Sequence, residues 1–161
     1  LKNFILKLFI STFFIVIPIL IIYIIKTKLN GGKNLLTFLF LIVGINDVFA
    51  YLIGSKIGKI KALKISPNKT IEGFFGGIIA CVIMGPLLIK FLNINLEINS
   101  FLLSLLISIF GIIGDLLESY LKRKFNKKDS GTILMSHGGI LDRVDSILFC
   151  APVFYLIIKI N

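Results

Sequence analysis

Five long apolar stretches dominate this sequence and restrict what it can fold into. Each is close to 20 residues long, about the length a helix needs to cross the hydrocarbon core of a bilayer. Backbone groups in lipid must bond within their own segment, so such stretches form helices. Asn46 and Asp47 interrupt the second stretch, and should face the bundle interior. We expect membrane spans at residues 4–25, 35–54, 73–92, 100–117 and 140–158.

The composition excludes the other broad classes of protein. Of 161 residues, 57% are hydrophobic and only 16% are charged. A soluble domain of this size cannot bury so much hydrocarbon, and disordered chains are poor in aromatic and β-branched residues. We therefore predict an all-α, polytopic membrane helix bundle that forms a single transmembrane domain over residues 1–161.

The charges indicate how the bundle is oriented. The 18 Lys and Arg residues outnumber the 8 acids, for a net charge of +10. In a membrane protein this balance favours basic cytoplasmic loops and contact with anionic lipid headgroups over nucleic-acid binding. Residues 55–72 and 118–139 are rich in lysine and residues 93–99 have none, so both basic segments should face the cytoplasm. The basic connection at residues 26–33 argues mildly against this scheme.

Most of the acids lie at the ends of the predicted spans or in the two basic segments. Asp115 and Glu118 are spaced i, i+3, and Asp142 and Asp145 repeat that spacing, so each pair shares a helix face. Carboxylates crowded in this way repel one another unless a cation holds them, and oxygen ligands favour a hard ion such as Mg²⁺. A second cation nearby is an open alternative, as are solvated helix ends stabilised by the helix dipole.

Cations and glycines are interleaved with these acids. Lys122, Arg123, Lys128 and Arg143 surround them, and His137, Gly138 and Gly139 precede the last span. Glycines let backbone N–H groups approach an anion, and Mg²⁺ beside Lys and Arg is what a nucleoside triphosphate requires. For any single lysine, an ordinary basic cytoplasmic loop is an equally good interpretation, and His137 could be a packing residue.

A second polar motif precedes the third span, with the sequence SPNKTIEG at residues 66–73. Thr70 can cap the helix that follows, and Lys69 can contact an anion beside the free N–H groups of that helix end. Capping together with a lysine that extends to the membrane surface explains the same residues without a ligand.

Together these motifs resemble the phosphatidate cytidylyltransferase family, whose members are also called CDP-diacylglycerol synthases. The resemblance rests on SYLKR at residues 119–123, KDSG at 128–131 and HGGILDRVD at 137–145, with DVFAY at 47–51 and SPNKTIEG upstream. It covers residues 38–158. The family usually has eight or nine spans, so we expect this chain to lack its N-terminal spans.

The resemblance implies a Mg²⁺-dependent transfer of a cytidylyl group from CTP to phosphatidate in the inner membrane, with the site facing the cytoplasm. It implies catalytic roles for Asp115, Asp142, Lys122, Arg123, Lys128 and Arg143. Metal ligands would come from Asp115, Asp142, Asp145 and Glu118. Substrate contacts would come from Asp47, Ser66, Lys69, Thr70, Glu72, Ser119, Asp129, His137, Gly138 and Gly139.

Three other interpretations stay open. A related enzyme would use CTP on an archaeol-type or polyprenyl lipid, because the sequence does not reveal the lipid tail. A cation channel or transporter would line its path with Asp47, Asp115 and Asp142, although transporters place such groups near the bilayer midplane. A noncatalytic subunit would require a partner chain. The oligomeric state is also open, with a homodimer as one option.

Overall fold

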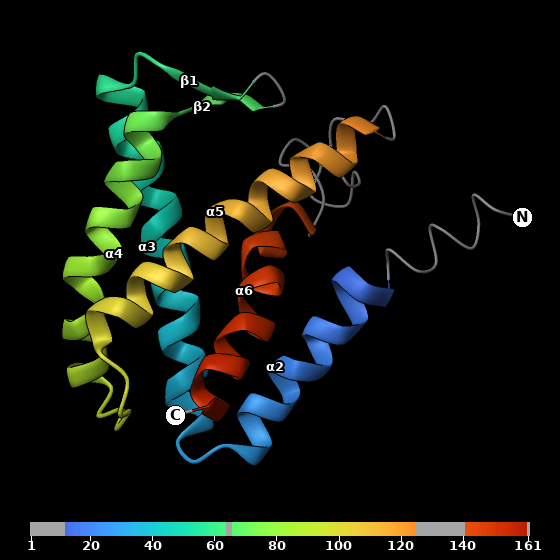
Figure 1. Cartoon of the computed structure of the whole chain (residues 1–161), viewed down its shortest axis with the longest axis vertical. Coiled ribbons are helices and arrows are strands. Elements are labelled where there is room, and N and C mark those ends of the chain that lie inside the picture. Colours follow the sequence, from blue (N-terminus) through green and yellow to red (C-terminus); the bar gives the residue numbers. More distant parts are fainter. Residues whose placement is uncertain (1–11, 64–65, 125–140, 161) are drawn as a thin grey trace, which may run out of the picture.

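The computed structural model describes residues 12–63, 66–124 and 141–160, and the side chains of 63, 67, 68 and 141–143 lie outside what it describes. The chain is a helical bundle with one small hairpin (Figure 1). A π-helical turn, η1 (Thr12–Val16), leads into α2 (Ile17–Lys28). The remaining elements are α3 (Gly32–Ile57), β1 (Lys61–Leu63), β2 (Ser66–Thr70), α4 (Ile71–Phe91), α5 (Ser100–Lys124) and α6 (Leu141–Ile160).

Three of the described helices are long and apolar enough to cross a membrane, namely α3, α4 and α5. They contain the predicted stretches 35–54, 73–92 and 100–117 almost entirely. The predicted stretch 140–158 matches α6, which carries charged residues in its first turn. Part of the stretch 4–25 lies outside the described residues. The all-α membrane bundle predicted from the sequence is confirmed, while the number of spans stays a prediction.

The core lies where four helices meet. Phe38 and Ile42 of α3 are fully buried there, together with Leu103 of α5, Phe154 of α6 and Ile25 of α2. The rings of Phe38 and Phe154 lie 6.0 Å apart between centroids. Because the outer helix surfaces are apolar as well, this core depends on close packing more than on the removal of hydrocarbon from water.

The seam between α3 and α4 is built on glycines of α4. A Cβ atom at Gly73 would lie 2.6 Å from the backbone oxygen of Ala50, and one at Gly77 would lie 2.7 Å from Oδ1 and 2.8 Å from the backbone oxygen of Asn46. Small residues let membrane helices approach closely in this way. The seam therefore fixes the position of α4 relative to the polar part of α3.

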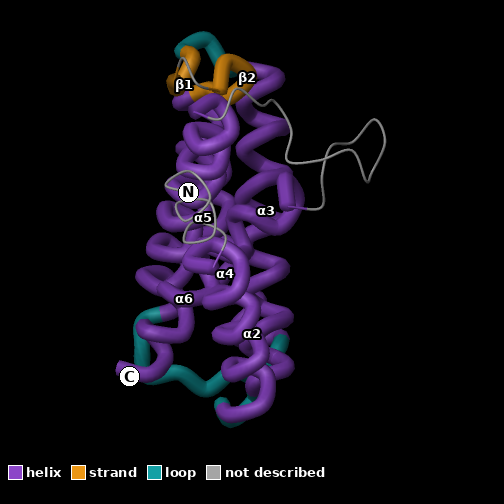
Figure 2. Tube along the Cα trace, turned by 90° about the vertical axis from the view of Figure 1, so that its right-hand side faces the viewer, coloured by secondary structure: helices purple, strands orange, loops and turns teal. Residues whose placement is uncertain are grey.

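The hairpin at one end of the bundle was not expected from the sequence. In β1 and β2, Lys61 pairs with Thr70 and Leu63 with Ser66 in an antiparallel register. The Glu72 carboxylate accepts bonds from the backbone N–H groups of Lys59 (3.0 Å) and Ile60 (3.1 Å). Figure 2 shows the hairpin at one end and the connections α2–α3 and α4–α5 at the other. Part of the basic segment at residues 55–72 thus forms a hairpin.

Helix α5 is longer than predicted, because it continues through the polar residues to Lys124. Asp115 and Glu118 therefore lie within the helix, nine and six residues before its end at Lys124, and not at its C-terminus as we expected. The i, i+4 ion pair between Glu118 and Lys122 helps to continue the helix past the apolar stretch. The helix dipole therefore has little effect on the energy of these two carboxylates, since its effect is limited to the last turn.

The glycine seam predicts that Gly77→Ala destabilises the bundle by about 1 to 3 kcal/mol, because the new methyl group meets backbone as well as side-chain atoms of Asn46. The measurement is the midpoint of unfolding by denaturing detergent or heat. Gly44→Ala on α3 is the matched control, because a Cβ there meets nothing within 4 Å. An equal effect of the two substitutions would contradict this account of the seam.

Candidate active site

A cavity of about 420 Å³ opens at the hairpin end of the bundle, between α3, the β2–α4 junction and α5. Four residues predicted to belong to a site line it, namely Asp47, Lys69, Thr70 and Asp115. Its other lining residues are Asn46, Ala50, Tyr51, Gly54, Ser55, Gly73, Phe74 and Ile112. The structure thus brings residues from three distant parts of the sequence to one cavity.

An ion pair between Lys69 and Asp115 joins the hairpin to α5 at this cavity. The two side chains are only 26% and 29% exposed. Burial lowers the pKa of the Lys69 ammonium below its usual range, and the attraction of Asp145 and Asp47 opposes that shift. A half-buried lysine of this kind is stabilised by the carboxylates around it.

A second ion pair continues the charged face of α5. Lys122 pairs with Glu118 one turn before it, and both side chains are largely buried. Lys122 and Glu118 also interact electrostatically with Lys69. Because Asp115, Glu118 and Lys122 are spaced by three or four residues, they present alternating charges along one helix face.

Asp145, near the start of α6, joins this group. Its Oδ1 atom accepts a bond from the backbone N–H of Ser146 at 2.8 Å, and its carboxylate interacts with Lys122 and Lys69. Acids from α3, α5 and α6 are therefore near one lysine of β2. Such a mixture of carboxylates and ammonium groups at a membrane boundary is costly to maintain and indicates a functional site.

The helix-capping interpretation of Thr70 is also correct. Its hydroxyl oxygen accepts a bond from the Gly73 N–H at 3.2 Å and caps α4. Glu72, for which a substrate contact stays a prediction, does not line the described cavity and accepts bonds from the backbone N–H groups of Lys59 and Ile60. These two bonds tie the first turn of α4 to the connection between α3 and β1, and so they help to fix the hairpin that carries Lys69.

We expected both Asn46 and Asp47 to face the interior, but only Asn46 does. Asn46 is 2% exposed and buried, whereas Asp47 is exposed on the side of α3 that lines the cavity. Adjacent residues of a helix point about 100° apart, so they cannot share one direction. Tyr51 and Ser55 also line the cavity but were not predicted as site residues. Their spacing of i+4 and i+8 from Asp47 places them on its face.

Several predicted residues lie away from the described cavity lining. Arg123 is exposed, and Ser66 and Ser119 are half-buried outside the cavity. Lys128, Asp129, His137, Gly138 and Gly139 lie outside the described residues, as do the side chains of Asp142 and Arg143. The part of the predicted site that the structure describes is thus its half on α3, β2 and α5, with Asp145 of α6.

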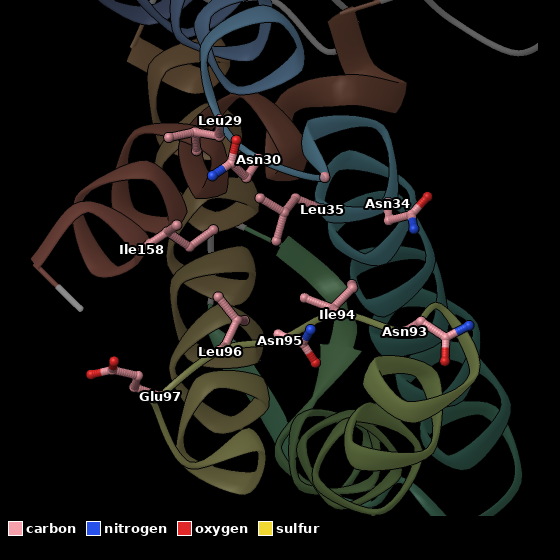
Figure 3. Close-up of a pocket in the computed structure, with 11 residues that line it drawn as sticks. Leu29, Asn30, Asn34, Leu35, Asn93, Ile94, Asn95, Leu96, Glu97 and Ile158 are labelled. Atoms are coloured by element: carbon pink, nitrogen blue, oxygen red, sulfur yellow. The ribbon is translucent and has the colours of Figure 1, made fainter.

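A second cavity, of about 480 Å³, lies at the opposite end of the bundle (Figure 3). Four asparagines line it, and Glu97 is its single charged residue. In Figure 3, Asn93, Asn95 and Glu97 of the α4–α5 connection lie across from Asn30 and Asn34. Without a cationic side chain in its lining, this cavity is poorly suited to bind phosphates. The cavity at the hairpin end is the better candidate for an active site.

The sequence model of the cytidylyltransferase family matches residues 2–161. The chain belongs to this family. Three similar proteins are named phosphatidate cytidylyltransferase. The one from Staphylococcus epidermidis is 47% identical over 140 residues, which are 84% of this chain and 53% of that protein. Those from Staphylococcus haemolyticus and Staphylococcus aureus are 46% and 44% identical over 131 residues, which are 80% of this chain and 50% of each protein.

The resemblance inferred from the motifs is therefore confirmed at the level of the family. The chain spans about half the length of the curated relatives that it matches. The cavity at the hairpin end holds Asp47, Lys69 and Thr70, which lie in the two upstream motifs of the cytidylyltransferase resemblance. Asp115 and Asp145 bring the remaining motif region to the same place.

The described side chains fit part of the predicted Mg²⁺ site. Asp115 supplies carboxylate oxygens at the cavity, which are the donors that Mg²⁺ prefers. In the described part of the chain, however, no three acidic, His or Cys side chains lie close enough together to hold one ion. Asp115 and Glu118 are instead neutralised by Lys69 and Lys122. The side chain of Asp142, another predicted ligand, lies outside the described residues.

The ion pair across the cavity predicts an efficient cross-link between cysteines introduced as Lys69→Cys and Asp115→Cys, in membranes, with a short bifunctional thiol reagent. Lys69→Cys with Ser100→Cys is the matched control, because residue 100 lies about 22 Å from residue 115 along α5. The measurement is whether the reagent still holds the two halves of the chain together after a protease has cleaved between them. Efficient linking of the control pair, or none of the 69–115 pair, would contradict this geometry.

Proposed function

We propose that this protein transfers the cytidylyl group of CTP to phosphatidate, forming CDP-diacylglycerol and pyrophosphate. The observation that carries the proposal is the cavity where Lys69 meets Asp115 at one end of a membrane bundle. Membership of the cytidylyltransferase family and the names of the similar staphylococcal proteins support it. The excess of lysine near the hairpin favours a cytoplasm-facing site in the inner membrane.

The chemistry needs alignment and charge neutralisation more than a strong base. A phosphate oxygen of the lipid attacks the α-phosphorus of CTP, a new P–O bond forms, and the bond from that phosphorus to the bridging oxygen of pyrophosphate breaks. The attacking phosphate is already ionised at neutral pH, so no proton has to be removed from it. Enzymes of this kind act by orienting the reactants and stabilising the charge that develops.

The residues of this chain supply the cations for that task. Lys69 and Lys122 are held near the cavity by Asp115 and Glu118, which keeps two ammonium groups positioned before a substrate binds. A triphosphate entering the cavity offers these lysines new anionic partners. Further candidates for phosphate contacts are Arg123 at the end of α5, Lys128 in the segment that follows, and Arg143 at the start of α6.

Magnesium belongs to the same proposal. Asp115 and Asp142 are the ligands we propose, with Asp145 and Glu118 orienting the lysines around them. A bound Mg²⁺ ion would polarise phosphate oxygens and neutralise charge on the triphosphate. The acids described at the hairpin end gather on one side of the bundle, which fits a surface reaction better than the path of a channel.

The function is tested with labelled CTP. Purified protein, Mg²⁺ and phosphatidate should transfer label from the α-phosphate of CTP into extracted lipid, and Asp115→Asn should lower that rate by about 100-fold or more, as expected for the loss of a charge that acts in the transition state. Glu97→Gln, at the opposite cavity, is the control and should keep full activity. Folded protein that labels no lipid, or an active Asp115→Asn variant, would refute the proposal.

The ion pair also predicts an effect on metal binding without nucleotide. Because Lys69 competes with a divalent cation for Asp115, Lys69→Met should tighten Mg²⁺ binding by about 10-fold, the equivalent of about 1.4 kcal/mol, while cytidylyl transfer is lost. Calorimetric titration with Mg²⁺ measures the first effect. Lys56→Met, at an exposed site on α3, should change neither property. Unchanged or weaker Mg²⁺ binding by Lys69→Met would contradict the competition.

A further inference from the structure

Two glycines at the end of α3, Gly54 and Gly58, stand four residues apart. In membrane helices this spacing commonly marks a surface where a second helix packs closely. In this structure the nearest side chain at both positions is that of Thr70, which ends β2 and caps α4. The two glycines therefore receive a side chain from the end of the hairpin, in addition to the neighbouring helix.

The Thr70 side chain is enclosed so closely that no methyl group fits beside it. A Cβ atom at Gly54 would lie 2.8 Å from the Thr70 Oγ1 atom, and one at Gly58 would lie 2.5 Å from Oγ1 and 2.6 Å from Cγ2. On the other side, a Cβ atom at Gly73 of α4 would lie 3.1 Å from the same Oγ1. Thr70 thus occupies a slot formed by Gly54, Gly58 and Gly73, which we call the glycine slot.

Hydrogen bonds fix Thr70 in the glycine slot. Its Oγ1 atom accepts a bond from the Gly73 N–H at 3.2 Å, so a shift of the side chain would leave that N–H without a partner at the start of a helix. The backbone of Thr70 pairs with Lys61 in the hairpin, and the next N–H, of Ile71, donates to the Ile60 oxygen at 3.0 Å. Residue 70 is therefore held by α3, α4 and the hairpin together.

The glycine slot lies beside the charged part of the candidate active site. Lys69 precedes Thr70 in the chain and pairs with Asp115 of α5, and Gly54 and Gly73 line the same cavity as this pair. Because Lys69 and Thr70 share a peptide bond, a displacement of Thr70 from the slot moves the point from which the Lys69 side chain starts. The slot therefore controls where the Lys69 ammonium can reach.

We propose that the glycine slot positions the site: Gly54 and Gly58 seat Thr70, and the seated Thr70 holds Lys69 opposite Asp115. The phosphate contact of Lys69 rests on the proposed function, whereas the slot itself is defined by packing. The inference gives the two glycines of α3 a role beyond helix packing. A larger residue at Gly54 then acts on the site through Thr70.

The first test measures the position of residue 69 without any substrate. In the protein with Lys69→Cys and Asp115→Cys, the initial rate of linking by a short bifunctional thiol reagent reports how close the two positions are. Gly54→Ala should lower this rate several-fold, because its methyl group displaces Thr70. Gly77→Ala is the matched control, since it disturbs the same helix seam one turn further along α4, against Asn46 and Ala50, and should leave the rate unchanged.

A double-mutant cycle tests whether the effect of Gly54→Ala passes through Thr70. Thr70→Ala removes the oxygen that the new methyl group meets, so Gly54→Ala should cause no further loss of linking in that background. Thr70→Val keeps the volume of the side chain but loses the bond to Gly73, and there the effect of Gly54→Ala should persist. Its disappearance in the Thr70→Val background would overturn the steric role of the slot.

Cytidylyl transfer measures the consequence for the proposed reaction. Gly54→Ala should lower kcat/KM for CTP by up to about 100-fold, the loss that a displacement of about 1 Å can cause at an active site. Gly44→Ala, on the same helix but with nothing within 4 Å of its Cβ, should keep full activity.

The outcomes separate this inference from the proposed function. An unchanged linking rate in folded Gly54→Ala protein, or an equal loss in Gly77→Ala, would overturn the positioning by the slot. A protein that transfers no label from CTP would refute the proposed function, while the linking experiment would still decide the inference. Full transfer by a Gly54→Ala protein whose linking rate has fallen would retain the slot and refute the phosphate contact of Lys69.

Discussion

The ion pair between Lys69 and Asp115 is the interaction on which the rest of the site depends. It connects β2 with α5 across residues 46 positions apart in sequence, at the boundary of a membrane bundle. A half-buried ammonium there is stable only if carboxylates surround it, because removing one partner of a buried pair leaves an uncompensated charge. Asp47 and Asp145 complete those surroundings from α3 and α6. The pair therefore gathers three helices around one cation.

The packing of the bundle places this pair where it is. The glycine seam of α4 holds α3 close, and the Thr70 cap fixes where α4 begins. Glu72, in the first turn of α4, accepts bonds from two backbone N–H groups in the connection between α3 and β1. Thr70 and Glu72 thus help to position the site by accepting bonds from backbone N–H groups, and their contacts with substrate stay a prediction.

Much of this arrangement was predicted from the lengths of the apolar stretches and from the spacing of the charged residues. The lengths of the apolar stretches predicted α3 and α4 to within a few residues, and the i, i+3 spacing of Asp115 and Glu118 predicted their shared face. The hairpin was missed because SPNKT at residues 66–70 has the composition of a turn, and its pairing with residues 61–63 is a tertiary effect. The extent of α5 was missed because ion pairs continued the helix beyond its apolar part. Depth in the cavity, which distinguishes Asn46 from Asp47, cannot be read from adjacent positions of a sequence.

We propose that Asp115 holds the Lys69 ammonium in place until CTP binds, and that Lys69 then pairs with a phosphate of the nucleotide. The most direct measurement is an experimental structure of the protein with CTP bound, in which the partners of the Lys69 ammonium are identified. Our account predicts that this ammonium contacts a phosphate oxygen and no longer pairs with Asp115. A bound triphosphate out of reach of Lys69, with the pair to Asp115 intact, would contradict it.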